Sequence, residues 1–540
     1  MRRIFKHLYI GALLLGTTAL ASCASDYLDT TPTQSVNEDH VWTTTEMGQK
    51  ALNGIAKIMV TQHAFYGQGF AGENAIMRMY ENLPSQNYNY NYYASGWAPI
   101  HNQTFHYRAD LKYDAYGWNY YYQIIGSANQ IIAKIDKAQG TDAEKKFIKA
   151  AALTFRAYAY EKLIRYYCYR WQDSNNGASR GLPLRLGEET DNLAASTLAE
   201  TYAQVYTDCQ EAITLFTSSG LKRESGEVWM PNINVAHAVY ARAALAKQDY
   251  ATALAQAKLA RANYALMSNA AYASGFCKPT SEWIFGSYGA SSEQLWYWAY
   301  GVQGACNGNH TTENPTGAGT IGHELIKRIP NNDARKQLFI TEDKFTTIDI
   351  TDAEQVDQTF GIINTDTAFL ETQVDSILKV HSVEGLSKPY PNGIVYLDGH
   401  LKFWVIDQPG VSYLPFIRSS EMVLIEAEAN YFLGNTADAQ AALVTLNATS
   451  GRNAAYTCTK TGDDLLNEIK DYRELELWGE GFAWSDYKRW NQPVVRHSFA
   501  EGGNAHISVA ITVPVEAANK WTWVYPNSET EHNKSVTMTE

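Results

Sequence analysis

The chain has 540 residues, of which 45% are hydrophobic, and this is enough apolar material for a large globular core. Its formal net charge of −13 argues against a nucleic acid partner, because an acidic chain and a phosphate backbone repel one another. The 36 tyrosines and 14 tryptophans combine an apolar ring with a polar edge, which suits wet binding surfaces as well as cores.

The N-terminus has the pattern of a bacterial secretion signal. Three basic residues precede an uncharged apolar stretch, Leu8–Ala21, that is too short to span a bilayer stably. Small residues then stand directly before Cys23, as in a bacterial lipobox. We therefore predict a signal peptide over residues 1–22 and acylation of Cys23, so that a lipid anchors the mature chain. An ordinary signal peptide with an incidental cysteine is the alternative.

The remaining chain, residues 23–540, is predicted to form one domain. It contains no second stretch that is long and apolar enough to cross a bilayer. The other cysteines are scattered without CxxC spacing, so neither a disulfide framework nor a zinc site is predicted, and isolated buried thiols are expected. No cofactor and no metal ion is predicted.

Helical hairpins are predicted in the first half of the chain. Apolar residues recur three or four apart in a first helix over about 44–60 and in a pair of helices within 118–166. A second pair follows within 202–247, and residues 248–250 then resemble the turn of a tetratricopeptide repeat. Because the connections are short, consecutive helices should pack side by side.

Two segments lack this periodicity. Residues 61–117 are rich in Gly, Asn and Tyr, and residues 270–414 combine frequent Gly, Asn, Thr and Asp with short β-like runs. Irregular segments of this length inside a compact protein are usually functional. The predicted fold is therefore mainly α, with tetratricopeptide-like helical hairpins, long irregular loops and a few short strands. The scaffold should occupy about 44–60, 118–265 and 416–490, with loop-rich ligand-binding regions at about 61–117 and 270–414.

The stretch from Asp471 to Trp490 carries the strongest local pattern. Arg473, Glu476 and Glu480 follow one another at intervals of three and four residues, so they share one helix face beside several aromatic residues. Such a charged row favours ion pairs that hold packed helices together. A carboxylate site is the alternative, but burial with partners is the commoner use.

The order of these residues resembles the C-terminal signature of the SusD/RagB family, Arg-x-x-Glu-Leu-x-x-Glu-Gly followed by Asp-x-x-Arg-Trp. Here the two parts begin at Arg473 and Asp486, and Ala483 stands where the family often carries an arginine. Residues 26–29 and 418–429 match further family segments, so the resemblance extends over almost the whole mature chain.

The resemblance implies a function. Members of this family are surface lipoproteins that capture nutrients, mostly glycans, for a SusC-like TonB-dependent transporter, and they are not enzymes. The resemblance therefore implies an oligosaccharide or polysaccharide ligand, a lipid-anchored position in the outer membrane that faces the cell exterior, and a scaffold role for Glu476 and Glu480. Relatives also take peptides, so a peptide ligand stays open.

The residues themselves show no catalytic motif. The chain has no Gly-x-Ser-x-Gly elbow, no HExxH helix and no phosphate-binding GxxxxGK[ST] loop. Carboxylates are plentiful, so a helical glycoside hydrolase stays as a less favoured alternative.

Two aromatic clusters are the candidate ligand contacts. Tyrosine and asparagine alternate over 87–93, which in an extended segment would place the tyrosines on one side. Flat rings flanked by Asn or Arg match the C–H faces and hydroxyl rim of a sugar. The second cluster lies near 296–300. The alternatives are a loop whose tyrosines cover helices, and a buried strand. The predicted glycan contacts are Arg78, Tyr88, Tyr90, Tyr92, Trp97, Trp296 and Trp298.

Overall fold

The computed structural model describes residues 42–63, 65–67, 69–91, 94–289, 304–306, 319–344, 348–364, 394–405, 413–516 and 521–536. Helices dominate this part of the chain and the strands are short, which confirms the predicted fold class. The predicted signal peptide and Cys23 lie outside the described residues.

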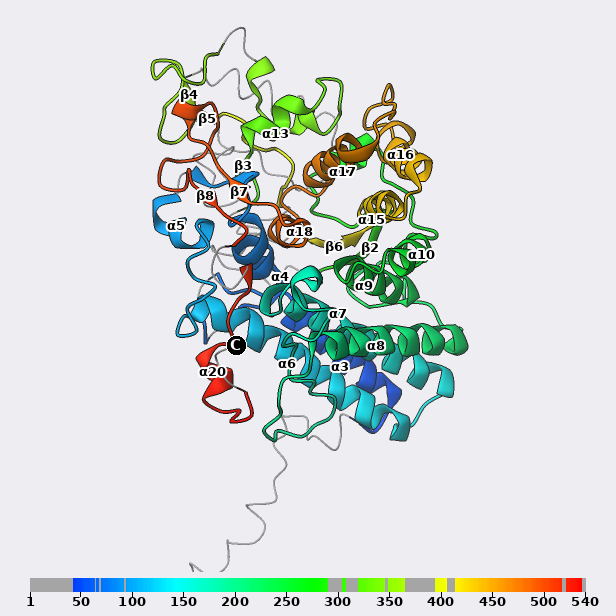
Figure 1. Ribbon diagram of the computed structural model, residues 1–540. Helices are drawn as coiled ribbons and strands as arrows, with labels where there is room; N and C mark the ends of the chain where they lie inside the picture. Colours follow the sequence, from blue (N-terminus) through cyan, green and yellow to red (C-terminus); the bar gives the residue numbers. More distant parts are fainter. Residues whose placement is uncertain are drawn as a thin grey trace, which may run out of the picture.

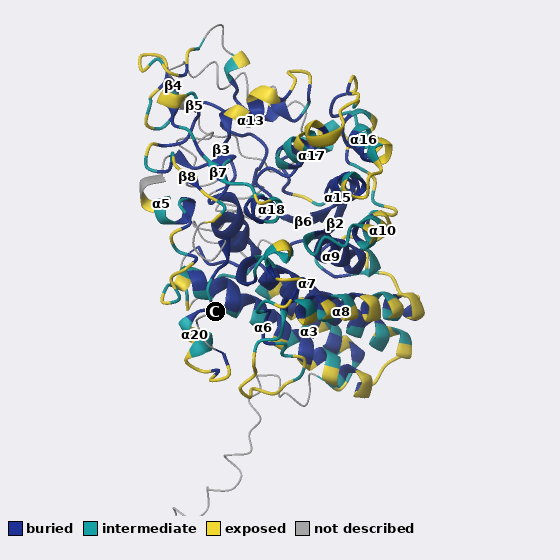
Figure 2. Cartoon of the chain, viewed as in Figure 1, coloured by how far each residue is buried: buried dark blue, intermediate teal, exposed yellow. Residues whose placement is uncertain are grey.

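The first half of the chain builds a layer of packed helices. Its helices are α3 (Thr45–Ile58), α6 (Lys112–Lys134), α7 (Asp142–Tyr167) and α8 (Leu198–Ser219). They lie across the lower half of the view in Figure 1. Because α7 contacts α3, α6 and α8, it is buried along most of its length, as the dark ribbon in Figure 2 shows. The predicted pair within 118–166 corresponds to α6 and α7, although α6 begins earlier, at Lys112.

Local sequence signals set the ends of these helices. Thr141 precedes α7 and Thr197 precedes α8. The side chain of each threonine accepts a hydrogen bond from the backbone amide of the glutamate three residues later, and the side chain of that glutamate accepts one from the backbone amide of the threonine. The two bonds together form a capping box. α8 ends at Gly220, whose φ of 68° lies in the left-handed region that glycine adopts without strain.

A second group of helices occupies the upper right of Figure 1. It consists of α9 (Ile233–Ala246), α10 (Tyr250–Ala260), α15 (Ser419–Phe432), α16 (Thr436–Val444) and α17 (Gly462–Glu476). The residues that α10 buries are all alanines, Ala253, Ala257 and Ala260, and these small side chains allow α9 and α15 to pack closely against it. The predicted turn at 248–250 is where α9 passes into α10.

The strands form two-stranded antiparallel pairs that join distant parts of the sequence. The pairs are β1 (Tyr88–Asn89) with β3 (Thr320–Ile321), β2 (Trp283–Gly286) with β6 (Pro415–Arg418), β4 (Ile362–Asn364) with β5 (Ile394–Tyr396), and β7 (Val494–Val495) with β8 (Thr512–Val513). Most of them lie at the upper left of Figure 1, whereas β2 and β6 lie beside α9 and α15.

The region 61–117 contains helices that the sequence analysis did not predict. α4 (Glu73–Ala75) continues into the π-helix η1 (Ile76–Asn82), and α5 (Ala94–His101) follows. Every residue from Glu73 to Asn82 is buried. Half of these residues are polar, and their side chains are covered by other parts of the chain and not by solvent: Asn82 bonds to Gly479 and Glu81 to Ser485.

A buried charge network joins the C-terminal signature to the irregular segment. Glu480 accepts hydrogen bonds from Lys402 Nζ at 2.8 Å and from Arg418 Nε at 2.7 Å. Burial would raise the pKa of Glu476, but the surrounding arginines outweigh burial and hold that pKa well below its ordinary value. The ion-pair interpretation of the signature therefore agrees with the structure. The network consists of Glu282, Asp333, Arg335, Lys402, Arg418, Arg452, Glu476 and Glu480.

The described cysteines are isolated thiols, as predicted. None of them is in a disulfide: Cys168, Cys209, Cys277 and Cys306 are buried, and Cys458 is partly exposed. They behave as small apolar side chains in the core.

Candidate ligand-binding site

Arg78 is the centre of the candidate site. It lies on the π-helix η1, and its guanidinium carbon stands 4.7 Å from the centre of the Trp97 ring and 5.2 Å from the centre of the Tyr90 ring. A guanidinium this close to two aromatic faces is attracted by both. Three of the predicted glycan contacts therefore meet in one place. A π-helix is uncommon and is often found at functional sites.

The C-terminal signature holds this π-helix in position. Asn82 donates to the carbonyl of Gly479 at 2.9 Å and accepts from the amide of Gly481 at 3.2 Å. Glu81 accepts from the amide of Ser485 at 3.0 Å, in the first turn of α18 (Ala483–Trp490). These bonds are buried, where a lost partner is costly. The signature, although distant in sequence, thus fixes the helix that carries Arg78.

The asparagines of the alternating segment bond within the protein. Asn89 donates to the side-chain oxygen of Asn504 at 2.8 Å, and Asn91 donates to the backbone carbonyl of Asn504 at 3.0 Å. Asn91 also accepts from the amide of His506 at 3.0 Å. All these side chains are buried. They tie the segment after η1 to the loop at 504–506, so the expectation that these asparagines flank a ligand is wrong.

Tyr88 and Tyr90 are buried, which corrects the expected exposure of the tyrosine face. Their exposed fractions are 4% and 2%. The ring of Tyr88 stacks on Trp478 with ring centres 4.9 Å apart, and the ring of Tyr90 lies against the guanidinium described above. Both tyrosines therefore support the site from within the core. Trp97 is only partly buried, and among the described predicted contacts it is the one that reaches the surface.

Tyr92, Trp296 and Trp298 lie outside the described residues. Their part in ligand binding stays a prediction from the sequence. Of the predicted contacts that the structure describes, Arg78 is buried like Tyr88 and Tyr90, and Trp97 is partly exposed. The expected exposure of Arg78 is therefore also wrong.

The histidine beneath the site is uncharged. His101 ends α5 and is fully buried, and burial together with the nearby cations Arg496 and Arg78 holds the pKa of His101 well below its ordinary value. No local pattern in the sequence points to this residue, because its burial depends on chain segments far away. Arg78 and His101 are 4% and 0% exposed, so the Trp97 ring is the part of this cluster that a ligand can reach.

The two carboxylates of the signature are not placed for catalysis. Glu476 and Glu480 are 0% and 4% exposed and are held by cations of the charge network. A catalytic carboxyl pair has to reach the substrate. In the described part of the chain, no group of three His, Cys, Asp or Glu side chains is arranged to hold a metal ion.

Two family models match the chain. Residues 26–245 match a SusD-like model described as starch-binding associating with outer membrane, and residues 402–539 match the model of the SusD family. The chain belongs to the SusD/RagB family. The resemblance found in the sequence is thereby confirmed, and its family is described as one of starch-binding proteins that associate with the outer membrane.

Solved structures of SusD proteins share the fold. A SusD-like carbohydrate binding protein from Bacteroides vulgatus has a TM-score of 0.70 at 20% identity, over 92% of this chain and 97% of that one. SusD superfamily proteins from Bacteroides thetaiotaomicron and Bacteroides fragilis have TM-scores of 0.64 and 0.66, at 20% and 18% identity. Each covers 92% of this chain and 100% of the other. A comparison with curated proteins gave no match. None of the helices described is long and apolar enough to cross a membrane.

Proposed function

We propose that this SusD/RagB protein is a cell-surface lipoprotein that captures oligosaccharides and passes them to a SusC-like TonB-dependent transporter in the outer membrane. Its family membership supports a carbohydrate ligand and an association with the outer membrane. The lipobox-like residues before Cys23 support attachment by a lipid. Binding, without any reaction on the sugar, is the proposed activity.

The observation that carries the proposal is the partly exposed Trp97 ring packed over the guanidinium of Arg78. A sugar ring presents an apolar C–H face that can stack on an indole. Arg78 itself is only 4% exposed, so its guanidinium supports the Trp97 ring from the protein side and does not meet the hydroxyl groups of the sugar. Arg78 is held from behind by Tyr90, and η1 is held by the C-terminal signature, so the surface is organised before a ligand arrives. A preorganised site loses less entropy on binding.

The test is calorimetry on the purified mature chain. A starch oligosaccharide such as maltoheptaose is the first probe, because of the description of the matched family, and a glycan array then widens the search. Specific binding of an oligosaccharide supports the proposal. Binding of peptides with no affinity for any glycan, or hydrolysis of the oligosaccharide, refutes it.

The proposed partner needs a separate experiment. Detergent extracts of the outer membrane should yield a large β-barrel transporter together with the tagged protein. Recovery of the tagged protein alone, from membranes that contain the transporter, contradicts the proposed handover.

A further inference from the structure

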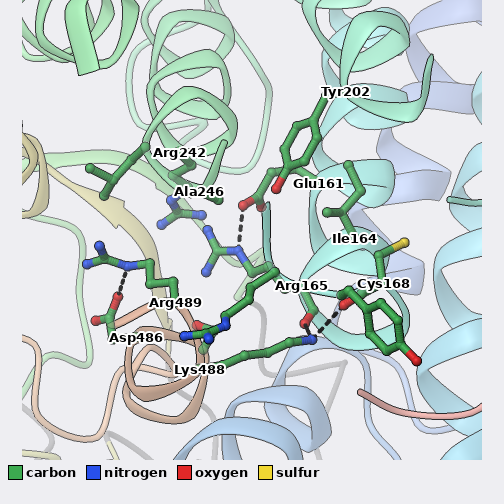
Figure 3. A pocket seen from close by; sticks show the side chains of 14 residues that line it. Glu161, Ile164, Arg165, Cys168, Tyr202, Arg242, Ala246, Asp486, Lys488 and Arg489 are labelled. Atoms are coloured by element: carbon green, nitrogen blue, oxygen red, sulfur yellow. Dashed lines mark hydrogen bonds and ion pairs between the residues drawn. The ribbon is translucent and has the colours of Figure 1, made fainter. Parts of the chain in front are cut away.

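A small cavity lined by charged and apolar side chains lies between α7, α8, α9 and α18 (Figure 3). Its volume is about 50 Å³. A single water needs roughly 10–15 Å³ on this measure, so the cavity accommodates several waters or one group of comparable size. The charged residues that line it are Arg165, Arg170, Arg242, Lys488 and Arg489, together with Glu161 and Asp486.

Arg165, Arg170 and Arg242 form their ion pairs with only part of the guanidinium, whereas Arg489 uses all three nitrogens on Asp486 and Glu428. Arg242 uses Nε and Nη2 to bind Glu421, both at 2.7 Å, and its Nη1 is buried without a hydrogen-bond partner among the described residues. Arg165 binds Glu161 through Nε, and Arg170 binds Asp173 through Nε and Nη2. The cavity is therefore lined by one buried donor that has no partner among the described residues, Arg242 Nη1, and by two further guanidinium groups.

Lys488 adds a cation without a carboxylate partner in the described part of the chain. Figure 3 shows its Nζ donating to the carbonyls of Arg165 and Cys168, at 2.8 and 2.7 Å. Burial lowers the pKa of Lys488 to about 7. A negatively charged group in the cavity would favour the protonated amine. An orphaned donor in a native structure calls for such an explanation, by an ion or by water.

The cavity also presents one acceptor. Glu161 binds Arg165 through one carboxylate oxygen, while its other oxygen, Oε2, is buried with no hydrogen-bond partner in the residues described. A ligand that satisfies both kinds of group must accept from cations and also donate one proton. A phosphate group that retains a P–O–H does both. Sulfate has no proton at neutral pH and would leave Glu161 Oε2 facing an anion.

We propose that this cavity binds a singly protonated phosphate group, either inorganic phosphate or a phosphate ester at the end of a larger ligand. The phosphate accepts hydrogen bonds from Arg165, Arg242 and Lys488 and donates its proton to Glu161 Oε2. Arg165, Tyr169 and Arg489 at the rim are partly exposed, which gives a ligand access from solvent. This site is independent of the proposed glycan site.

Calorimetry in a phosphate-free buffer at fixed ionic strength tests the proposal. Sodium phosphate should bind with saturation, and sodium sulfate at least about tenfold more weakly, which corresponds to about 1.4 kcal/mol. Arg165→Gln should weaken phosphate binding at least about tenfold. Arg170→Gln is the second variant: it removes a positive charge from the cavity lining and should also weaken phosphate binding, and because the ion pair of Arg170 with Asp173 is partly exposed, the fold should survive. The control is Arg328→Gln, which removes the same charge from the exposed pair with Asp471.

Glucose 6-phosphate, with glucose as its control, distinguishes the two sources of the phosphate. Binding of inorganic phosphate supports the free ion, and binding of the ester alone supports an end group. Wild-type protein that binds neither overturns the proposal. So does equal affinity for phosphate and sulfate, or affinity that is unchanged in both cavity variants.

Discussion

Replacing Glu480 by alanine tests whether the C-terminal signature is scaffold. In the wild type Glu480 is 4% exposed and receives hydrogen bonds from Lys402 and Arg418. The substitution leaves both cations buried with an incomplete set of partners, and breaking a buried pair in this way costs about 3–5 kcal/mol. A chain of 540 residues has an unfolding entropy of about 1 kcal/mol/K, from about 2.1 cal/mol/K per residue. The melting temperature should therefore fall by about 3–5 °C.

Differential scanning calorimetry measures this fall directly. The matched control is Glu46→Ala, which removes a glutamate from the exposed pair with Lys50 and should leave the melting temperature unchanged. Glycan affinity should survive in Glu480→Ala at a temperature where the variant is folded. A normal melting temperature combined with lost ligand binding would refute the scaffold interpretation and place Glu480 in a functional site.

Three further predictions concern the anchor, a titrating carboxyl and the buried tyrosine. Cys23→Ala should release the folded protein from the membrane fraction; retention in that fraction contradicts the lipid anchor. Burial raises the pKa of Glu474 from 4.5 to about 7, so its stabilising contribution is complete below pH 4.5 and is lost as pH rises through about 7. The melting temperature of Glu474→Gln should therefore exceed that of the wild type at about pH 8 but not at about pH 4.5. If the melting temperatures of the two proteins change with pH in parallel, the raised pKa of Glu474 is excluded. Tyr88→Ala should lower the melting temperature, because the ring of Tyr88 stacks on Trp478 in the core. An unchanged melting temperature would contradict the burial of Tyr88.

The helical scaffold was predictable because its signals are local. The apolar stripes of α6 and α7 and the small residues of α10 appear in short windows of sequence, and burial in the structure follows them. The row of Arg473, Glu476 and Glu480 likewise predicted ion pairs.

The candidate site was predictable only in part, since its geometry depends on contacts between distant residues. Asn89 and Asn91 alternate with tyrosines, which suggested a sugar-binding loop, but their partners lie in the loop at 504–506. Tyr88 is buried by Trp478, which is equally remote in sequence. The helices over 73–82 were missed, and their burial depends on the distant C-terminal signature, which bonds Asn82 and Glu81.

The central claim is that an oligosaccharide binds on Trp97 beside Arg78. Calorimetry with the glycan selected on the array, comparing wild type with Trp97→Ala, tests it most directly. By analogy with bases stacked on aromatic rings, one ring contributes about 1–3 kcal/mol, so affinity should fall by about 5- to 150-fold. Trp97 also packs against the core and over the buried Arg78, so the melting temperature should fall, and affinity is compared at a temperature where the variant is folded. Full affinity in a folded Trp97→Ala protein would contradict the proposed site.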